Sequence, residues 1–173
     1  MNVELLSYPT ESDWLFVKQC ALVTVGKKAI RPPDGTWKSK ILNARHSVIR
    51  ELRFAFVLAD IPFYVMGHLV RHHVGFQPYV KTSRQDRTGI DRNERRQTDP
   101  VDMILSLNAE ALMTLANKRL CMMADEKTRE IVRLMCDEAA EATPEIAAFL
   151  VPMCVYHGGV CHELEGCGRC TKG

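Results

Sequence analysis

Apolar and polar positions along the first third of the chain predict two helices and a strand. Residues 12–25 carry apolar side chains at helical spacing after a candidate N-cap, and Gly26 ends this helix. Proline, aspartate and glycine at 31–35 indicate a loop, and a short helix is expected over 38–45. Residues 52–59 alternate between apolar and polar side chains, and this period of two predicts a strand with one buried face.

The remaining pattern predicts one more strand and a larger share of helix. Pro62 suits the first turn of a helix that follows the first strand. Asn108 is a good N-cap for a later helix, and Pro144 ends the longest periodic segment. The expected segments are an irregular stretch over 74–100, a strand over 101–107 and helices over 109–118, 124–142 and 145–151. The whole pattern indicates an α+β fold, with a small sheet packed against several helices.

Composition adds limits rather than a function. A chain of 173 residues with 46% hydrophobic and 25% charged residues is ordinary for one soluble globular domain. The net charge of +2 gives no general reason to expect nucleic acid or membrane as a partner. We expect a cytoplasmic protein, because the sequence has no run of 18 apolar residues and no signal-peptide pattern. Its seven cysteines then indicate thiols or metal rather than disulfides.

The candidate chemistry concentrates in the stretch from Ile61 to His73. Three of the six histidines fall within six consecutive positions there. On a helix, His68, Arg71 and His72 stand at i, i+3 and i+4 and share one face, which suits an anionic ligand. Residues 81–96 form a basic segment that is either a solvated loop or a surface for phosphates.

Two segments together resemble the flavin-dependent thymidylate synthases, the ThyX family. The family hallmark begins Arg-His-Arg and ends with a serine, one residue, an arginine and a tyrosine. Arg71-His72-His73 keeps the Arg-His start, and Thr82-Ser83-Arg84 follows one residue late. A later segment, Leu107–Arg119, is similar to a second family motif, and its Asn108 and Arg119 keep the family's separation of 11 positions. The resemblance covers roughly residues 10–150.

The resemblance implies an enzyme that methylates dUMP at C5 of the uracil. In the family, methylenetetrahydrofolate supplies the carbon, FAD reduced by NADPH supplies hydride, and homotetramers combine residues from several subunits. His73 stands where the family has its third arginine, Phe76 where it has a serine, and the family's Asn-Glu pair is absent. These departures are compatible with FAD binding, and leave open a different pyrimidine nucleotide or a different transfer to C5.

The resemblance also implies roles for individual residues. Arg71 and Arg119 are the catalytic candidates, and the flavin-binding candidates are His46, Arg71, His72, His73 and Asn108. The nucleotide-binding candidates are His68, Thr82, Ser83, Arg84, Arg96 and Arg119. Simpler interpretations remain for three groups: Asn108 as a plain N-cap, the histidines as helix-surface residues, and Thr82-Ser83-Arg84 as a polar loop.

The C-terminal residues 153–173 form a Cys/His-rich tail that the resemblance does not explain, after a catalytic domain over 1–152. The candidate metal ligands are Cys154, His157, Cys161, His162, Cys167 and Cys170. Cys154 and His157, and likewise Cys167 and Cys170, are separated by two residues. This spacing lets each pair chelate a metal and is typical of tetrahedral zinc. A reduced tail without metal is the main alternative, and an iron–sulfur cluster ranks below zinc. The alternative function is a non-catalytic nucleotide- or nucleic-acid-binding module that uses residues 81–96 and a metal-bound tail.

Overall fold

The computed structural model describes residues 1–173, except for the side chain of Arg92. Its centre is a four-stranded antiparallel sheet in the order β1-β2-β4-β3. The strands are β1 (Asn2–Ser7), β2 (Arg53–Pro62), β3 (Phe76–Val80) and β4 (Pro100–Asn108). The expected α+β fold with a small sheet is therefore confirmed.

The two central strands bury one face in the hydrophobic core. Alternate residues of β2, such as Phe54 and Phe56, are fully buried, and each pairs with a buried leucine of β4. Phe54 lies opposite Leu107 and Phe56 opposite Leu105. The period of two in the sequence thus marks the face that the helices cover.

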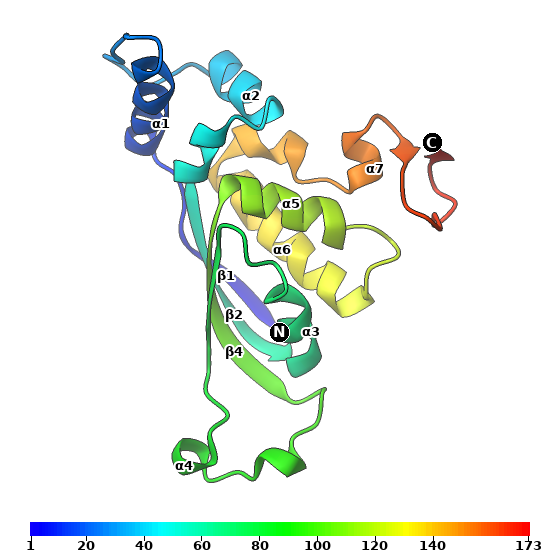
Figure 1. Ribbon diagram of the computed structural model, residues 1–173. Coiled ribbons are helices and arrows are strands. Elements are labelled where there is room, and N and C mark those ends of the chain that lie inside the picture. Colours follow the sequence, from blue (N-terminus) through cyan, green and yellow to red (C-terminus); the bar gives the residue numbers. More distant parts are fainter.

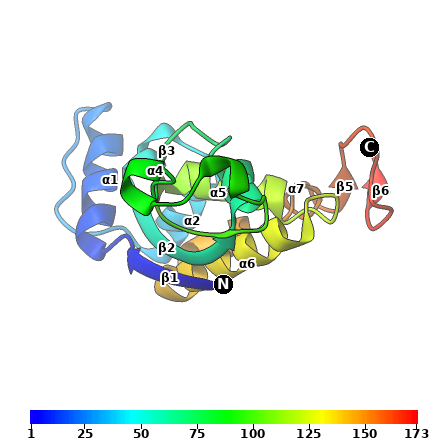
Figure 2. The ribbon, with the colours of Figure 1, turned by 90° about the horizontal axis from the view of Figure 1, so that it is seen from below.

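Helices lie against this buried face and at one end of the sheet (Figures 1 and 2). The longer helices are α1 (Glu11–Val23), α2 (Gly35–Asn43), α3 (Phe63–Leu69), α5 (Ala109–Arg119) and α6 (Glu126–Ala142). The short ones are α4 (Gln85–Thr88), α7 (Met153–Tyr156) and the 3₁₀ helices η1 (Ser47–Glu51), η2 (Arg92–Glu94) and η3 (Pro144–Phe149). Side-chain caps define where α5 and α6 begin: Asn108 accepts from the amide of Ala111 at 2.9 Å, and Asp125 from that of Thr128 at 2.9 Å.

Two segments extend away from this body. The arm (residues 81–99) connects β3 to β4, carries α4, and projects away from α5 (Figure 1). The tail (residues 153–173) begins with α7 and ends in a two-stranded parallel sheet of β5 (Val160–Cys161) and β6 (Thr171–Lys172). Figures 1 and 2 both place the tail and α1 on opposite sides of the molecule.

Several predicted boundaries were wrong. The strand expected to stop at Ala59 continues to Pro62, because a bulge between Leu58 and Ile61 places Asp60 at φ +55° and carries the chain onward. The edge strand β1 was not predicted. The stretch 74–100 is also not uniformly irregular, since it contains β3, α4 and η2.

The motif helix is shorter than expected. It ends at Leu69, so Arg71 and His72 lie beyond it in the turn that leads to β3. The prediction that His68, Arg71 and His72 share one helical face is therefore wrong. Within the described residues, no helix is long and apolar enough to cross a membrane.

Candidate functional site

A pocket of about 490 Å³ lies between the turn after α3 and the start of α5. Its lining combines residues that are far apart in the sequence and mostly polar. They are Arg50, Arg71, His72, His73, Val74, Gly75, Asn108, Glu110, Ala111 and Thr114. Four of the expected site residues thus meet at one place, from the two segments that carry the family resemblance.

Gly75 and Asn108 hold the two sides of this pocket together. The backbone amide of Asn108 donates to the carbonyl of Gly75 at 3.0 Å. Gly75 has φ +70°, and a Cβ there would lie 2.3 Å from Nδ2 of Asn108. Only glycine fits this turn, because a side chain would be both strained and in collision. The role of Asn108 as N-cap of α5 is confirmed, and the same side chain lines the pocket.

The pocket is electropositive. Arg71 is exposed, and the first turn of the eleven-residue α5 contributes the positive end of a helix dipole. Arg50 also lines the pocket and pairs with Glu110, with 2.5 Å between Nε and Oε2. Sequence reasoning missed Arg50, because it lies in a short 3₁₀ helix outside both motifs. The combination suits an anionic group such as a phosphate or a reduced flavin.

His72 and Arg119 form a direct contact at the side of the pocket. Nε of Arg119 donates to Nε2 of His72 at 3.0 Å, and Nη2 donates to the carbonyl of His68 at 3.3 Å. Burial, followed by the charges of Arg119 and His73, lowers the pKa of His72. Burial, followed by the charge of Arg71, lowers the pKa of Arg119. His72 is therefore a neutral imidazole with its proton on Nδ1, since an acceptor nitrogen carries none.

Two other predicted histidines lie outside this pocket. Nδ1 of His68 is 2.8 Å from the hydroxyl of Thr128, which itself donates to Asp125 at 3.0 Å. The hydroxyl of Thr128 thus accepts from His68, whose ring packs at the N-terminus of α6. His46 is exposed at the start of η1, where its Nδ1 accepts from the amide of Val48 at 3.4 Å.

The predicted phosphate-binding residues lie on the arm, away from the Arg71 pocket of the same chain (Figure 1). Thr82 and Ser83 line a separate pocket of about 280 Å³. The guanidinium of Arg84 binds both carboxylate oxygens of Asp86, at 3.0 and 2.8 Å. Arg96 is exposed near the end of the arm.

The tail gathers its predicted ligands around a third pocket, also of about 280 Å³. All seven cysteines of the chain are free thiols. Among the described residues, no three His, Cys, Asp or Glu side chains are already arranged to hold a metal ion. Zinc therefore stays a prediction at this point.

Comparison with solved structures defines the class of fold. The structure of the UMP/dUMP methylase PolB from Streptomyces cacaoi bound with 5-Br dUMP is similar at a TM-score of 0.69 and 15% identity, over 86% of this chain and 93% of that one. The ThyX of Helicobacter pylori complexed with FAD and dUMP is similar at 0.69 and 13% identity, over 87% and 100%. PolB bound with 5-Br UMP gives 0.61 and 14% identity, over 86% and 92%.

The chain therefore has the fold of the flavin-dependent thymidylate synthases, as the sequence motifs implied. More particularly, it has the fold shared by ThyX and the ThyX-like methylase PolB. No family model and no curated protein sequence matches the chain. At 13–15% identity the likeness defines the fold and leaves the reaction to be argued from the site.

Proposed function

We propose that this protein is a flavin-dependent methylase of pyrimidine nucleotides, of the thymidylate synthase type. It methylates dUMP at C5, with methylenetetrahydrofolate as carbon donor, FAD as cofactor and NADPH as reductant. One observation carries the proposal: the two segments that resemble the family meet through His72 and Arg119, 47 positions apart, with 3.0 Å between their nitrogens. Two independent motif matches that meet in space support a common site.

The donor set of the Arg71 pocket fits a flavin nucleotide. Arg71 and the first turn of α5 favour negative charge, while Asn108 and His73 add hydrogen-bonding groups at the rim. These residues, with His72, would hold FAD, which when bound supplies the hydride for the transferred carbon. His46 lies outside the pocket and would reach FAD from the start of η1. A cation near the flavin ring stabilises the negative charge of its reduced form.

Arg119 and His72 prepare the place for the uracil. The contacts of Arg119 with His72 and the carbonyl of His68 fix the plane of the guanidinium before a ligand arrives. A fixed planar donor favours recognition of a planar ring with carbonyl acceptors, and it polarises a carbonyl on which charge develops. Neutral His72 keeps the proton on Nδ1 and presents a hydrogen-bond donor without an added positive charge.

A second copy of the chain would complete the nucleotide site. Thr82, Ser83 and Arg84 are the candidates for the phosphate, yet the arm carries them away from the Arg71 pocket of their own chain. In a homotetramer, the arm of one copy can reach the pocket of another. The phosphate candidates on the arm then serve a pocket that they do not reach within their own chain. Pairing of Arg84 with Asp86 reduces the free positive charge of the arm, which disfavours a nucleic acid as its partner, and a phosphate at Arg84 would replace the Asp86 carboxylate.

An absorbance spectrum followed by a tritium-release assay tests the proposal. Purified protein is expected to show flavin absorbance, or to acquire it with added FAD. It should then release tritium from dUMP labelled at C5 when methylenetetrahydrofolate and NADPH are present. A parallel assay with UMP shows whether the ribose 2′-hydroxyl affects the reaction. Protein that fails to bind FAD under any of these conditions would overturn the proposal.

A further inference from the structure

Four cysteine thiols of the tail surround one cavity. The pocket of about 280 Å³ is lined by Cys154 from α7, Cys161 from β5, and Cys167 and Cys170 from the last loop. Cys161 is buried, and the other three are half-buried. This density of sulfur is unusual for a reduced chain without a function for it.

The last loop of the tail folds over the buried cysteine. A Cβ on Gly166 would lie 3.4 Å from Sγ of Cys161, and Gly166 directly precedes the Cys167–Cys170 pair. Cys161 therefore belongs to the same group as the Cys167–Cys170 pair.

The backbone of the tail is shaped to bring these residues together. Gly158, Gly159 and Gly168 have φ of +68°, +94° and +78°, and they form the turns between the cysteines. The amide of Gly173 donates to the carbonyl of Cys161 at 3.0 Å, and that of Thr171 donates to Gly159 at 3.2 Å. These bonds hold β5, which carries Cys161, beside β6, which directly follows Cys170.

We propose that the tail is a binding site for one Zn²⁺ ion, with Cys154, Cys161, Cys167 and Cys170 as its four ligands. Zinc in structural sites takes four such ligands in a tetrahedron. Binding replaces the thiol protons, which pass to the solvent, and brings the four sulfurs together around the metal. The site does not depend on the methylase activity proposed above.

The two histidines of the tail line the same pocket but pack against other rings. The rings of His157 and His162 meet edge to face with centroids 5.2 Å apart, and His157 also packs against Tyr156 at 5.4 Å. Both rings lie at the rim of the pocket and are exposed. Because the thiols are buried or half-buried and both imidazoles are exposed, we assign the four cysteines of the tail as the ligands.

The tail has a physical need for a metal. Its 21 residues bury little apolar surface of their own, and Leu164 is 94% exposed. Segments this small fold stably when a metal or disulfide replaces the missing core. The tail is also tied to α5, because Lys118 and Glu163 lie 3.5 Å apart next to Arg119. Zinc would thus fix the surface beside the proposed uracil site.

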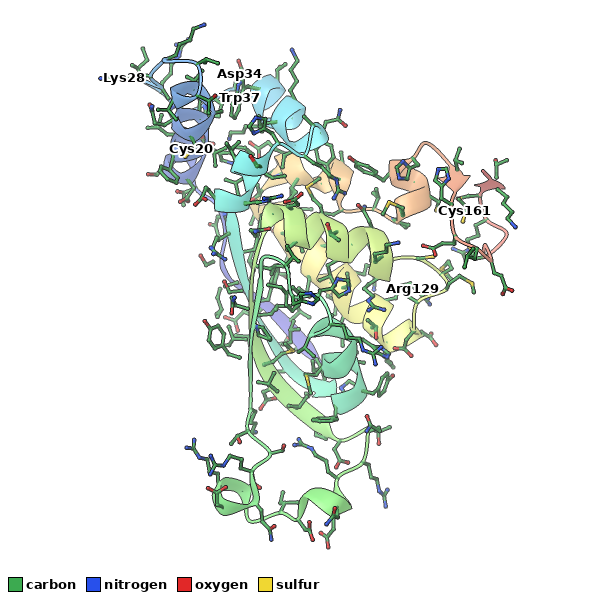
Figure 3. The ribbon with its side chains drawn as sticks, in the orientation of Figure 1. Cys20, Lys28, Asp34, Trp37, Arg129 and Cys161 are labelled. Carbon is green, nitrogen blue, oxygen red and sulfur yellow. The ribbon has the colours of Figure 1, made fainter. Side chains whose placement is uncertain are left out.

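Metal analysis of the full chain tests this site. Protein purified with reductant and Zn²⁺, then freed of loose metal, is expected to hold one zinc per chain. Co²⁺ alone should give the visible spectrum of a tetrahedral thiolate site. The variants Cys167→Ser and Cys170→Ser should bind zinc more than tenfold more weakly. The matched control Cys20→Ser should bind it normally, since Cys20 lies on α1, across the molecule from Cys161 (Figure 3).

Two further variants and one chemical measurement decide the ligand set. His157→Ala and His162→Ala should keep both the zinc and the Co²⁺ spectrum, and loss of either would overturn the four-cysteine assignment. Reduced protein that holds no zinc or Co²⁺ would overturn the site itself. So would a Cys154–Cys170 disulfide found by mass spectrometry in metal-free protein that still keeps its folded tail. Flavin binding is measured separately, so its failure leaves this result intact.

Discussion

Arg119 donates from Nε to Nε2 of His72 at 3.0 Å, which joins the end of α5 to the turn after α3. The contact determines the protonation of His72, because a nitrogen that accepts a hydrogen bond cannot also carry the proton. It also explains why the pKa of His72 is lowered: burial disfavours the imidazolium, and the positive charge of Arg119 disfavours it further.

The free energy of unfolding should therefore fall as the solution is acidified. The unfolded chain protonates His72 near its ordinary pKa of 6.5, whereas the folded chain resists until a lower pH. The unfolded state binds more protons in that interval, so stability is full above about pH 6.5 and is lost below it. Chemical denaturation of the protein from pH 7.5 to 5 measures this slope.

His72→Gln tests the origin of that slope. Glutamine keeps an acceptor for Arg119 and does not titrate, so the part of the slope that is due to His72 should disappear. His46→Gln is the matched control. His46 is exposed, and its ring accepts from the amide of Val48 rather than from a guanidinium. An unchanged slope in His72→Gln would show that His72 is not the titrating group.

The close approach of Gly75 to Asn108 should make this glycine intolerant of a side chain. Gly75→Ala places a Cβ 2.3 Å from Nδ2 of Asn108, at φ +70°. The left-handed conformation costs about 1–2 kcal/mol and loss of the cap about 1 kcal/mol, so the free energy of unfolding should fall by roughly 2–3 kcal/mol. Thermal denaturation should show a clearly lower Tm.

Gly67→Ala, in the same motif, is expected not to lower the free energy of unfolding. Gly67 lies within α3, and a Cβ there would have no atom within 4 Å. Alanine has the higher helix propensity, so this variant should be as stable as the parent or up to about 1 kcal/mol more stable. Equal destabilisation of both variants would rule out the specific role of the Gly75 turn.

The elements that the sequence predicted well are those with local signals. The helices over 109–118 and 124–142 appear at almost those bounds, since Asn108 and Asp125 cap them and their apolar positions follow helical spacing. The strand β2 is visible from its alternation. In contrast, β1 and β3 are edge strands with short signals. Alternation in β1 covers only Asn2–Leu5, and β3 has five residues of which most are not buried, so neither pattern was long enough to predict a strand.

The site was harder to predict, because its assembly depends on tertiary contacts. Motif matching named Arg71, His72, Asn108 and Arg119, but it placed the first two on a helix that ends at Leu69. The carbonyl of His68 accepts from Arg119 instead of continuing the helix. No local pattern marks Arg50, which reaches the pocket only through its pairing with Glu110 across 60 positions.

A buried lysine of α2 stabilises the contact between α1, α2 and η3. Lys38 is 4% exposed, pairs with Glu11, and lies 2.7 Å from Glu145 and 5.1 Å from the centre of the Trp14 ring. Lys38→Met would leave Glu145, whose side chain is 24% exposed, without its partner. We expect a loss of about 1–3 kcal/mol, below the 3–5 typical of fully buried pairs because both carboxylates retain some solvent.

The pH dependence of the free energy of unfolding gives an independent test of the Lys38–Glu145 pair. Burial acts to raise the pKa of Glu145, but the hydrogen bond and charge of Lys38 outweigh it, so its pKa is lowered in the fold. Its stabilising contribution is present above the ordinary value of 4.5 and is lost as pH falls through the lowered value. Lys38→Met should flatten this acid slope, and exposed Lys40→Met should leave it unchanged.

The separation between Arg84 on the arm and Arg71 in the pocket predicts complementation between inactive chains. Arg84→Ala removes the proposed phosphate contact, and Arg71→Ala removes the cation of the pocket, so each variant alone should be inactive. In co-expressed mixed oligomers, some sites combine an intact arm from one chain with an intact pocket from another. Random assembly restores about a quarter of the sites, and tritium release from dUMP measures that recovery.

Arg87→Ala is the control on the arm, because Arg87 is exposed and carries no proposed role. It should retain full activity both alone and in mixtures. If the mixed Arg84 and Arg71 variants recover nothing although light scattering shows oligomers, the arm serves its own chain's pocket. Recovery near a quarter instead requires that each site takes its phosphate ligand from a second copy, because neither chain supplies both arginines.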